Sequence, residues 1–380
     1  MDLVCFSHLR WNFVYQRPQH LLTRFSKVYR TFYIEEPIIE DSEKPFLQVN
    51  NPENNIWIVT PHLHHGLNHK NTLDEQKKLI TAFFNDLNIQ KYIFWYYTPM
   101  AFELGSSFDP ELTIYDCMDE LSNFKFAPPL LKELEKELFK NADLVFTGGH
   151  NLFKAKRDFH HNIYPFPSSI DKSHFEKARN VENEPNDQKN IPHPRFGFYG
   201  VIDERLNIEL LKNIAAKKSN WHFVIVGPVV KIDPQTLPKS PNIHYLGGKS
   251  YNELPLYLSG WDVATIPFVL NESTEFISPT KTPEYLAAGK PVISTSIIDV
   301  VTPYGEQGIV HIADTDEEFI KAGEIELARK NKEEWLQVTD EFLSSNSWDQ
   351  TWEEMMRLIN TTHAKKYSKI VPNLKQKNYV

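Results

Sequence analysis

The chain has 380 residues, 41% of them hydrophobic, and its 50 acidic and 41 basic side chains give a net charge of −9. This size suits two globular domains, and the acidic balance argues against general nucleic-acid binding. The two cysteines, Cys5 and Cys117, exclude a disulfide framework and a cysteine-rich metal site, and without a signal-peptide pattern or an apolar run of membrane-spanning length we expect a cytoplasmic protein.

The first half of the chain alternates short apolar runs with helical patterns. A helical pattern begins at Pro18, and a second covers residues 130–141. Runs typical of buried parallel strands lie at 3–6, 31–34, 56–61, 92–97, 112–115 and 142–147. This alternation predicts an α/β domain over residues 1–175, which binds ligands where its parallel strands end.

Polar residues follow two of these strands. His8, Arg10 and Trp11 come after the first, and such loops are often functional, although a polar loop without a ligand is the alternative. Asp116 and Asp119 come after the strand at 112–115, where one carboxylate in a closed cleft can act as a general base. The alternative is that both aspartates cap the following helix.

Two motifs suggest metal ions, but simpler interpretations fit both. Residues 62–69, HLHHGLNH, hold four histidines without a nearby cysteine or carboxylate to complete a ligand set, so we expect a solvated loop. The run Asp314-Thr315-Asp316 precedes a helical pattern, so we expect it to cap that helix.

The second half of the chain begins with a charged, proline-bearing segment, 176–194, which we interpret as a linker. Strand patterns then return at 195–200, 222–228, 243–247 and 263–268, with a helical pattern at 206–216. These predict a second α/β domain over 195–345, a last amphipathic helix over 346–362 and a basic tail over 363–380.

The most informative stretch is 278–296, SPTKTPEYLAAGKPVISTS, which predicts a loop, a short helix and a buried strand. Pro283 suits the first helical position, and Gly289 suits a left-handed C-cap. Lys281, Glu284 and free backbone N–H groups would then surround one crevice. This set suits a sugar-nucleotide, because lysine and amides bind pyrophosphate and a carboxylate binds ribose hydroxyls. An ordinary helix cap with a surface lysine is the alternative.

The run EYLAAGKPVIST resembles the donor-binding signature of GT-B glycosyltransferases, especially the family-four-like and teichuronic-acid-type enzymes that build bacterial surface polysaccharides. The segments HLRW, QRPQHLL and DCMDELSNF resemble further parts of these enzymes, so the resemblance covers nearly the whole chain. It implies two Rossmann-like domains that face each other across a cleft, with a C-terminal helix that crosses back to the first domain.

The resemblance also implies a role for each candidate site residue. Asp119, with Asp116 as second choice, would be the base, and Arg205 and Lys281 would stabilise the leaving phosphate. The acceptor would be bound by His8, Arg10, Trp11 and Arg17, and the donor by Gly200, Arg205, Gly227, Tyr245, Lys281, Thr282 and Glu284. Many retaining members carry a second glutamate eight positions before Glu284, where this chain has Phe276, and Glu275 misses that register by one residue. The stereochemical outcome therefore stays open.

We therefore predict a metal-independent hexosyltransferase of cell-envelope polysaccharide biosynthesis without a further cofactor. It would move a sugar from a nucleoside-diphosphate sugar, expected to be UDP-linked, to a hydroxyl of a glycan or lipid-linked glycan. A nucleotide-sugar epimerase of the same fold and a non-catalytic sugar-nucleotide-binding subunit are the alternatives. The basic tail predicts peripheral contact with the inner face of a membrane, against the alternative of a disordered end, through Lys365, Lys366, Lys369, Lys375 and Lys377.

Overall fold

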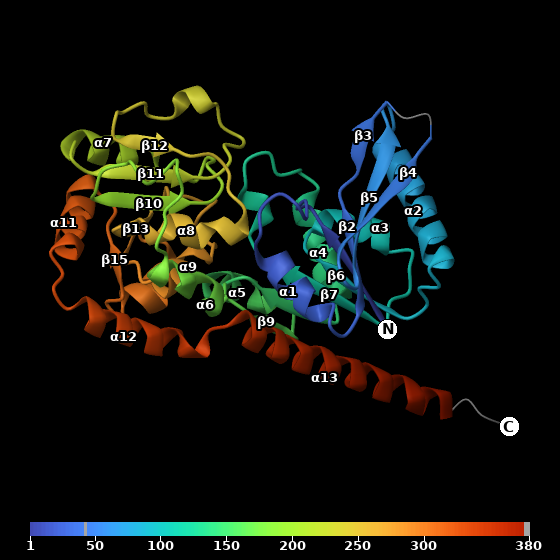
Figure 1. The fold of residues 1–380 in the computed structure, drawn as a ribbon. Coiled ribbons are helices and arrows are strands. Elements are labelled where there is room, and N and C mark those ends of the chain that lie inside the picture. Colours follow the sequence, from blue (N-terminus) through green and yellow to red (C-terminus); the bar gives the residue numbers. More distant parts are fainter. Residues whose placement is uncertain (42–43, 376–380) are drawn as a thin grey trace.

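Two sheets, joined by two passages of the chain, form two α/β domains that lie beside each other (Figure 1). The structure is a computed structural model that describes residues 1–41 and 44–375, with side chains up to residue 368. None of the described helices is both long enough and apolar enough to cross a membrane.

The first domain is built on a nine-stranded sheet in the order β3-β5-β2-β1-β6-β7-β8-β9, with β4 added at β5. All pairs are parallel except β4–β5. The strands are β1 (Asp2–Ser7), β2 (Arg30–Glu35), β3 (Ile38–Glu40), β4 (Phe46–Glu53), β5 (Ile56–His64), β6 (Tyr92–Tyr96), β7 (Leu112–Cys117), β8 (Leu144–Thr147) and β9 (Ile163–Pro165). The helices are α1 (Arg17–Phe25), α2 (His69–Asp86), α3 (Phe102–Gly105), α4 (Leu131–Asn141), α5 (His150–Lys156) and α6 (Lys172–Phe175).

The antiparallel strand β4 was not predicted, and it changes the interpretation of the histidine-rich segment. β5 is paired on both sides, by β3 and β4, and therefore continues three residues beyond the predicted end. His62 lies in this strand and bonds Glu40 at 2.9 Å and Gln48 at 3.0 Å. The prediction of a solvated loop over the whole segment is thus wrong for its first residues.

The second domain is built on a parallel six-stranded sheet in the order β12-β11-β10-β13-β14-β15. The strands are β10 (Arg195–Tyr199), β11 (His222–Val226), β12 (Ile243–Tyr245), β13 (Val263–Ile266), β14 (Val292–Ser294) and β15 (Val310–Ile312). The helices are α7 (Ile208–Lys217), α8 (Leu254–Ser259), α9 (Lys281–Ala287), α10 (Ile298–Val300), α11 (Asp316–Leu327) and α12 (Lys332–Phe342).

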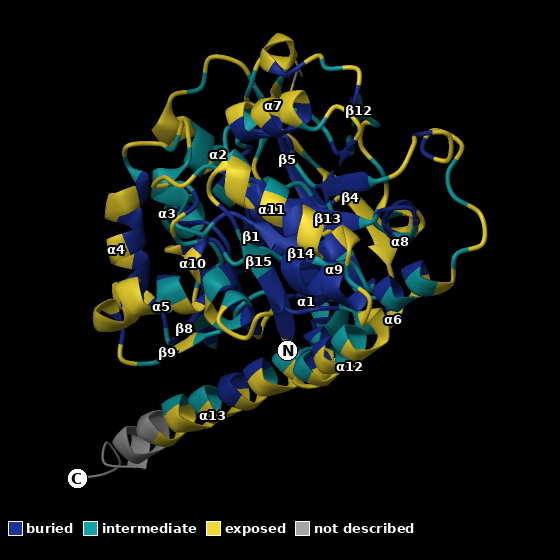
Figure 2. Ribbon diagram, turned by 90° about the vertical axis from the view of Figure 1, so that its left-hand side faces the viewer, coloured by how far each residue is buried: buried dark blue, intermediate teal, exposed yellow. Residues whose placement is uncertain are grey.

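Most of the strands form the interior of the two domains, as the burial pattern in Figure 2 shows, whereas β4 is largely exposed. Successive residues of β1 alternate between two cores, with Leu3 and Cys5 in one and Val4 and Phe6 in the other. Helices therefore cover both faces of each sheet, which explains why the strands appear in the sequence as continuous apolar runs.

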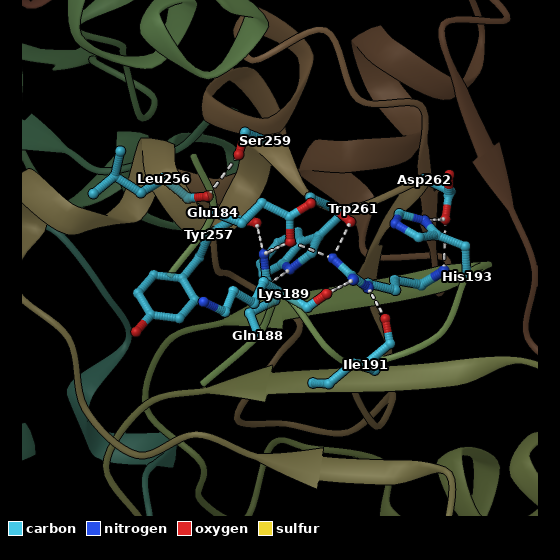
Figure 3. Close-up of polar contacts among 12 residues, drawn as sticks. Glu184, Gln188, Lys189, Ile191, His193, Leu256, Tyr257, Ser259, Trp261 and Asp262 are labelled. Atoms are coloured by element: carbon cyan, nitrogen blue, oxygen red, sulfur yellow. Dashed lines mark hydrogen bonds and ion pairs between the residues drawn. The ribbon is translucent and has the colours of Figure 1, made fainter. Parts of the chain in front are cut away.

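The segment predicted as a linker packs along the second domain instead of hanging free (Figure 3). Its Gln188 is fully buried, and its amide accepts a 3.0 Å hydrogen bond from the Trp261 indole. The Arg195 guanidinium, 2% exposed, donates to the carbonyl of Ile191 at 2.7 Å and to the Glu184 carboxylate. The charged residues that made this segment look unstructured therefore anchor it.

The last helix, α13 (Trp348–Lys375), crosses from the second domain along the first, as expected (Figures 1 and 2). Trp348, Met355 and Ile359 are buried in a core of the first domain. The helix does not end at residue 362, because contacts continue beyond it, including a 2.8 Å ion pair between Lys366 and Asp143. Within the described residues the predicted tail is thus a continuation of α13, while residues 376–380, with Lys377, lie outside them.

The two passages between the domains lie side by side. The Trp348 backbone N–H donates to the carbonyl of Ile170 at 3.2 Å, and the Ser169 hydroxyl bonds the Asn346 side chain at 2.5 Å. The chain therefore leaves and re-enters the first domain at one place.

Candidate active site

Three adjoining cavities lie where the two domains meet. The wide cavity, of about 540 Å³, and the charged cavity, of about 470 Å³, each have walls from both domains. The narrow cavity, of about 100 Å³, has Asp119 and Lys281 in its wall. Arg205 lines all three cavities, so its guanidinium marks their meeting point.

Two predicted glycines form the floor of the charged cavity at the ends of β10 and β11. Gly200 has φ +137°, and a Cβ there would lie 2.5 Å from Cε of Lys281. Gly227 has φ +151°, and a Cβ there would lie 1.8 Å from the Gly200 carbonyl oxygen. Only glycine fits these positions, and both glycines line the charged cavity.

The helix α9 supplies the opposite wall of this cavity. It begins at Lys281, two residues before the predicted start, and Pro283 is tolerated because the first turn of a helix has free N–H groups anyway. Gly289 follows the helix with φ +74°, as predicted. Lys281 and Glu284 lie one turn apart and both line the charged cavity, whereas Thr282 is fully buried and lines none of the three.

Glu284 and Lys281 are both withdrawn from water. Glu284 is 4% exposed, and burial raises its pKa, against the opposing effects of a hydrogen bond from the Tyr199 hydroxyl and the charge of Lys281. Burial and the neighbouring Arg205 lower the pKa of Lys281, whose ammonium lies 5.7 Å from the ring of Phe268. An anion entering the cavity would offset this penalty by stabilising the charged lysine.

Arg205 is held in a fixed direction by a carboxylate and an aromatic ring. Its Nη2 and Nε donate to the Asp203 carboxylate at 2.7 and 3.0 Å, and its guanidinium lies 5.5 Å from the ring of Phe124 in the first domain. Such a planar, oriented donor suits a phosphate group.

Asp119 lines both the wide and the narrow cavity. Burial raises its pKa to about 6, against the opposing charges of Arg205, Arg17 and Lys281. The next residue, Glu120, is fixed by a 2.6 Å ion pair with Lys156. Asp119 is therefore a carboxylate near neutral pH that is poised to accept a proton.

The second candidate base, Asp116, is held in an ion pair with a buried arginine. It is fully buried, lines none of the three cavities and forms a two-pronged ion pair with Arg17 at 2.9 and 3.0 Å. Arg17, predicted to bind the acceptor, is itself 4% exposed and also donates to the carbonyl of Phe166 at 2.7 Å. The pair supports the floor of the site.

The other predicted acceptor residues divide between the cavities. His8 and Arg10 line the wide cavity, and Trp11 lines the charged one. Burial lowers the pKa of His8 to about 4, and its Nδ1 is buried without a hydrogen-bond partner among the described residues. Arg10 and the backbone N–H of Trp11 both bond Glu35, at 3.0 and 2.8 Å.

The predicted site omitted several aromatic residues of the charged cavity, Tyr251 among them. Tyr245, predicted to bind the donor, lines none of the three cavities, and its hydroxyl donates to the carbonyl of Pro238 at 3.2 Å. Tyr251 lines the charged cavity instead, stacked 4.2 Å from His174 and 4.4 Å from Tyr15 of the first domain. The sequence could have indicated Tyr251, because it lies in the loop after β12, the strand that contains Tyr245.

Two segments of the second domain, α10 and the loop that leads into α9, are hydrogen-bonded to α5 of the first domain. The Asp299 carboxylate accepts hydrogen bonds from the backbone N–H groups of His150 and Asn151, the first two residues of α5, at 2.9 and 3.0 Å. A Cβ at Gly149 would lie 2.2 Å from this carboxylate, so glycine permits the approach. The Asn151 side chain also donates to the carbonyl of Glu275 at 2.9 Å.

The motifs that suggested metals have structural roles. Thr315 caps α11 through a reciprocal bond pair with Glu318, as expected for a capping sequence. Within residues 1–41 and 44–375, no group of three or more His, Cys, Asp or Glu side chains is placed to hold a metal ion. Phe276, at the position of the usual second glutamate, packs against a core of the first domain, and the Glu275 side chain is exposed.

Sequence comparison relates the chain to glycosyltransferases. Residues 193–326 match the family described as Glycosyl transferases group 1. TuaH of Bacillus subtilis strain 168, which carries the provisional name of teichuronic acid biosynthesis glycosyltransferase, is 26% identical over 299 residues, or 71% of this chain and 72% of TuaH.

Solved structures resemble nearly the whole chain. Sucrose-phosphate synthase from Thermosynechococcus elongatus gives a TM-score of 0.68 at 15% identity, over 96% of this chain and 99% of its own. A trehalose-6-phosphate protein from E. coli, bound with UDP-2-fluoro glucose, gives 0.68 at 11%, with the same coverage of 96% and 99%. Anabaena HepE, in complex with UDP and glucose, gives 0.65 at 11%, over 95% and 99%. At these identities the structures show the fold alone, and they confirm the predicted GT-B arrangement of two Rossmann-like domains.

Proposed function

We propose that the chain transfers a sugar from a UDP-sugar to an acceptor hydroxyl. The match to the group 1 glycosyltransferases and the GT-B fold support glycosyltransferase activity. The observation that carries this proposal is the convergence of Asp119, Arg205, Lys281 and Glu284 on adjoining cavities between the domains. The presence of UDP compounds in two structural neighbours supports uridine as the nucleoside of the donor.

The charged cavity would hold the donor. The Glu284 carboxylate would accept hydrogen bonds from the ribose, while Lys281 and Arg205 would bind the diphosphate. The bare backbone at Gly200 and Gly227 would let the phosphates approach closely. This arrangement would place the diphosphate of the donor at the junction of the three cavities, beside the candidate base.

The wide cavity would hold the acceptor. Its wall contains apolar and aromatic side chains from both domains, among them Phe13 and Phe126, which are 48% and 76% exposed. Lys125 and Lys231 lie beside the aromatic rings of this wall. Apolar surface beside cations suits a glycan that is linked to a lipid through a phosphate, and the similarity to TuaH supports a role in cell-envelope polysaccharide biosynthesis.

In a single displacement, the acceptor oxygen forms a bond to the anomeric carbon while the bond from that carbon to the donor phosphate breaks. Asp119 would accept the proton of the attacking hydroxyl. Arg205 and Lys281 would stabilise the charge that develops on the departing diphosphate, which is usually the largest catalytic term. This route inverts the anomeric configuration, which NMR of the product can verify.

We propose that transfer needs no bound metal, because Arg205 and Lys281 already supply two positive charges at the leaving group. Activity should therefore persist after dialysis against a chelator. A loss of activity that added Mg²⁺ or Mn²⁺ restores would contradict this part of the proposal.

Product analysis with labelled sugar-nucleotides tests the function as a whole. Full-length protein, a panel of UDP-sugars and glycan or lipid-linked acceptors should yield a labelled acceptor. A nucleotide-sugar epimerase would instead yield an epimer or free sugar without acceptor, and a non-catalytic binding subunit would retain the nucleotide without turnover. Either outcome would replace the proposal.

A further inference from the structure

Tyr199 is a polar residue of the charged cavity to which the proposed function gives no role. It ends β10 and is 6% exposed. Its hydroxyl donates a hydrogen bond to Oε2 of Glu284, which lies on α9. This bond joins two separate elements at the cavity wall, so it can set the direction of the carboxylate.

The Tyr199 ring is itself held from several sides. Its backbone N–H donates to the Tyr285 hydroxyl at 2.9 Å, and the Tyr285 ring meets it edge-on with centroids 4.8 Å apart. The ring of Phe175 lies parallel to it at 6.4 Å. A ring packed in this way presents its hydroxyl in one direction.

The two oxygens of the Glu284 carboxylate differ in their surroundings. Oε2 accepts the bond from Tyr199. Oε1 accepts no hydrogen bond from the described residues, yet it is not among the buried side-chain oxygens that lack a partner. Oε1 therefore keeps access to the cavity and has free lone pairs for a ligand.

We propose that Tyr199 is a positioning residue, which holds Glu284 so that Oε1 receives the ribose hydroxyls of the bound nucleotide. The inference rests on the proposed function, because it assumes a nucleoside diphosphate in the charged cavity. A carboxylate that is fixed before binding loses less conformational freedom when the ribose arrives, so the bond should increase the preference for ribose over its deoxy forms.

Calorimetry on the full-length protein can measure this preference. The tightest of UDP, ADP and GDP is compared with its own 2′,3′-dideoxy analogue. Tyr199→Phe keeps the packed ring, and we expect it to weaken the ribonucleotide about tenfold while it leaves the dideoxy analogue within about twofold. Tyr257→Phe is the matched control, because it removes the hydroxyl of a buried tyrosine that bonds Asp187 and lines none of the three cavities. The control should leave the ribose preference unchanged, and thermal unfolding should show that both variants are folded.

A merely structural tyrosine would not change the ratio of the two affinities. If Tyr199→Phe weakens both ligands equally, or weakens neither, the positioning role is wrong. Glu284→Ala tests the premise separately, because it should abolish the preference for ribose. A wild-type protein that binds none of the three nucleoside diphosphates would overturn the proposed function itself. Binding with a preference that depends on Glu284 but survives in Tyr199→Phe would overturn only the role of Tyr199.

Discussion

The pH dependence of transfer should report directly on Asp119. Its pKa of about 6 results from burial in the wall of two cavities. A base with this pKa is about nine-tenths ionised at pH 7 and about one-tenth ionised at pH 5, so kcat/KM should fall about tenfold between these values. An aspartate with the ordinary pKa of about 3.9 would lose only about a tenth of its ionised form over the same range.

Asp119→Asn keeps the size of the side chain and removes the proton acceptor. Turnover should fall by about 10² or more, and the decline of the remaining activity between pH 7 and pH 5 should disappear, while nucleotide binding persists. Glu275→Gln is the control, because Glu275 is an exposed carboxylate of the loop that leads into α9. Initial rates with saturating donor and varied acceptor, at constant ionic strength, provide the measurement.

Two results would refute this reasoning. One is a wild-type profile that stays flat between pH 5 and pH 7, which would show that no group with a pKa near 6 acts as the base. The other is near-normal turnover in Asp119→Asn. A retained anomeric configuration in the product would then identify the alternative, because a retaining route does not need this base.

Three further predictions concern stability, the donor and the membrane. Arg17→Met should lower the free energy of unfolding by about 3 to 5 kcal/mol, since it leaves Asp116 buried without its partner; urea denaturation should show this, and a loss under about 1 kcal/mol would contradict it. Lys281→Ala should weaken nucleoside diphosphate binding in calorimetry by about 1.5 to 3 kcal/mol, whereas the exposed Lys212→Ala should not; equal affinities would remove Lys281 from the site. Full-length protein should sediment with anionic vesicles at low salt better than a truncation after residue 362, and equal sedimentation would contradict the predicted membrane contact.

The sequence predicted the parallel strands well because strands that are buried on both faces form continuous apolar runs. It also indicated the glycines at 200 and 227, whose backbone conformations only glycine adopts readily. The ion pair of Arg17 with Asp116 could not be predicted in the same way, because the two residues are distant in the chain; Arg17 itself lines the narrow cavity, and its predicted role in acceptor binding stays a prediction. Pairing across β4 and β5 was missed for a similar reason, since an edge strand with an exposed face carries little apolar signal.

The paired passages of the chain restrict how the domains can move. Two domains on a single flexible tether could twist, slide and separate in any direction. Here the segment after the first passage is anchored to the second domain through Arg195, and the passages near Ile170 and Trp348 are bonded to each other. These two adjacent segments form a hinge, so rotation of one domain about them is the main motion that the connections permit. The Asp299 contact with α5 joins the domains at a second place, so a rotation that separated the cavity walls there would have to break its two hydrogen bonds.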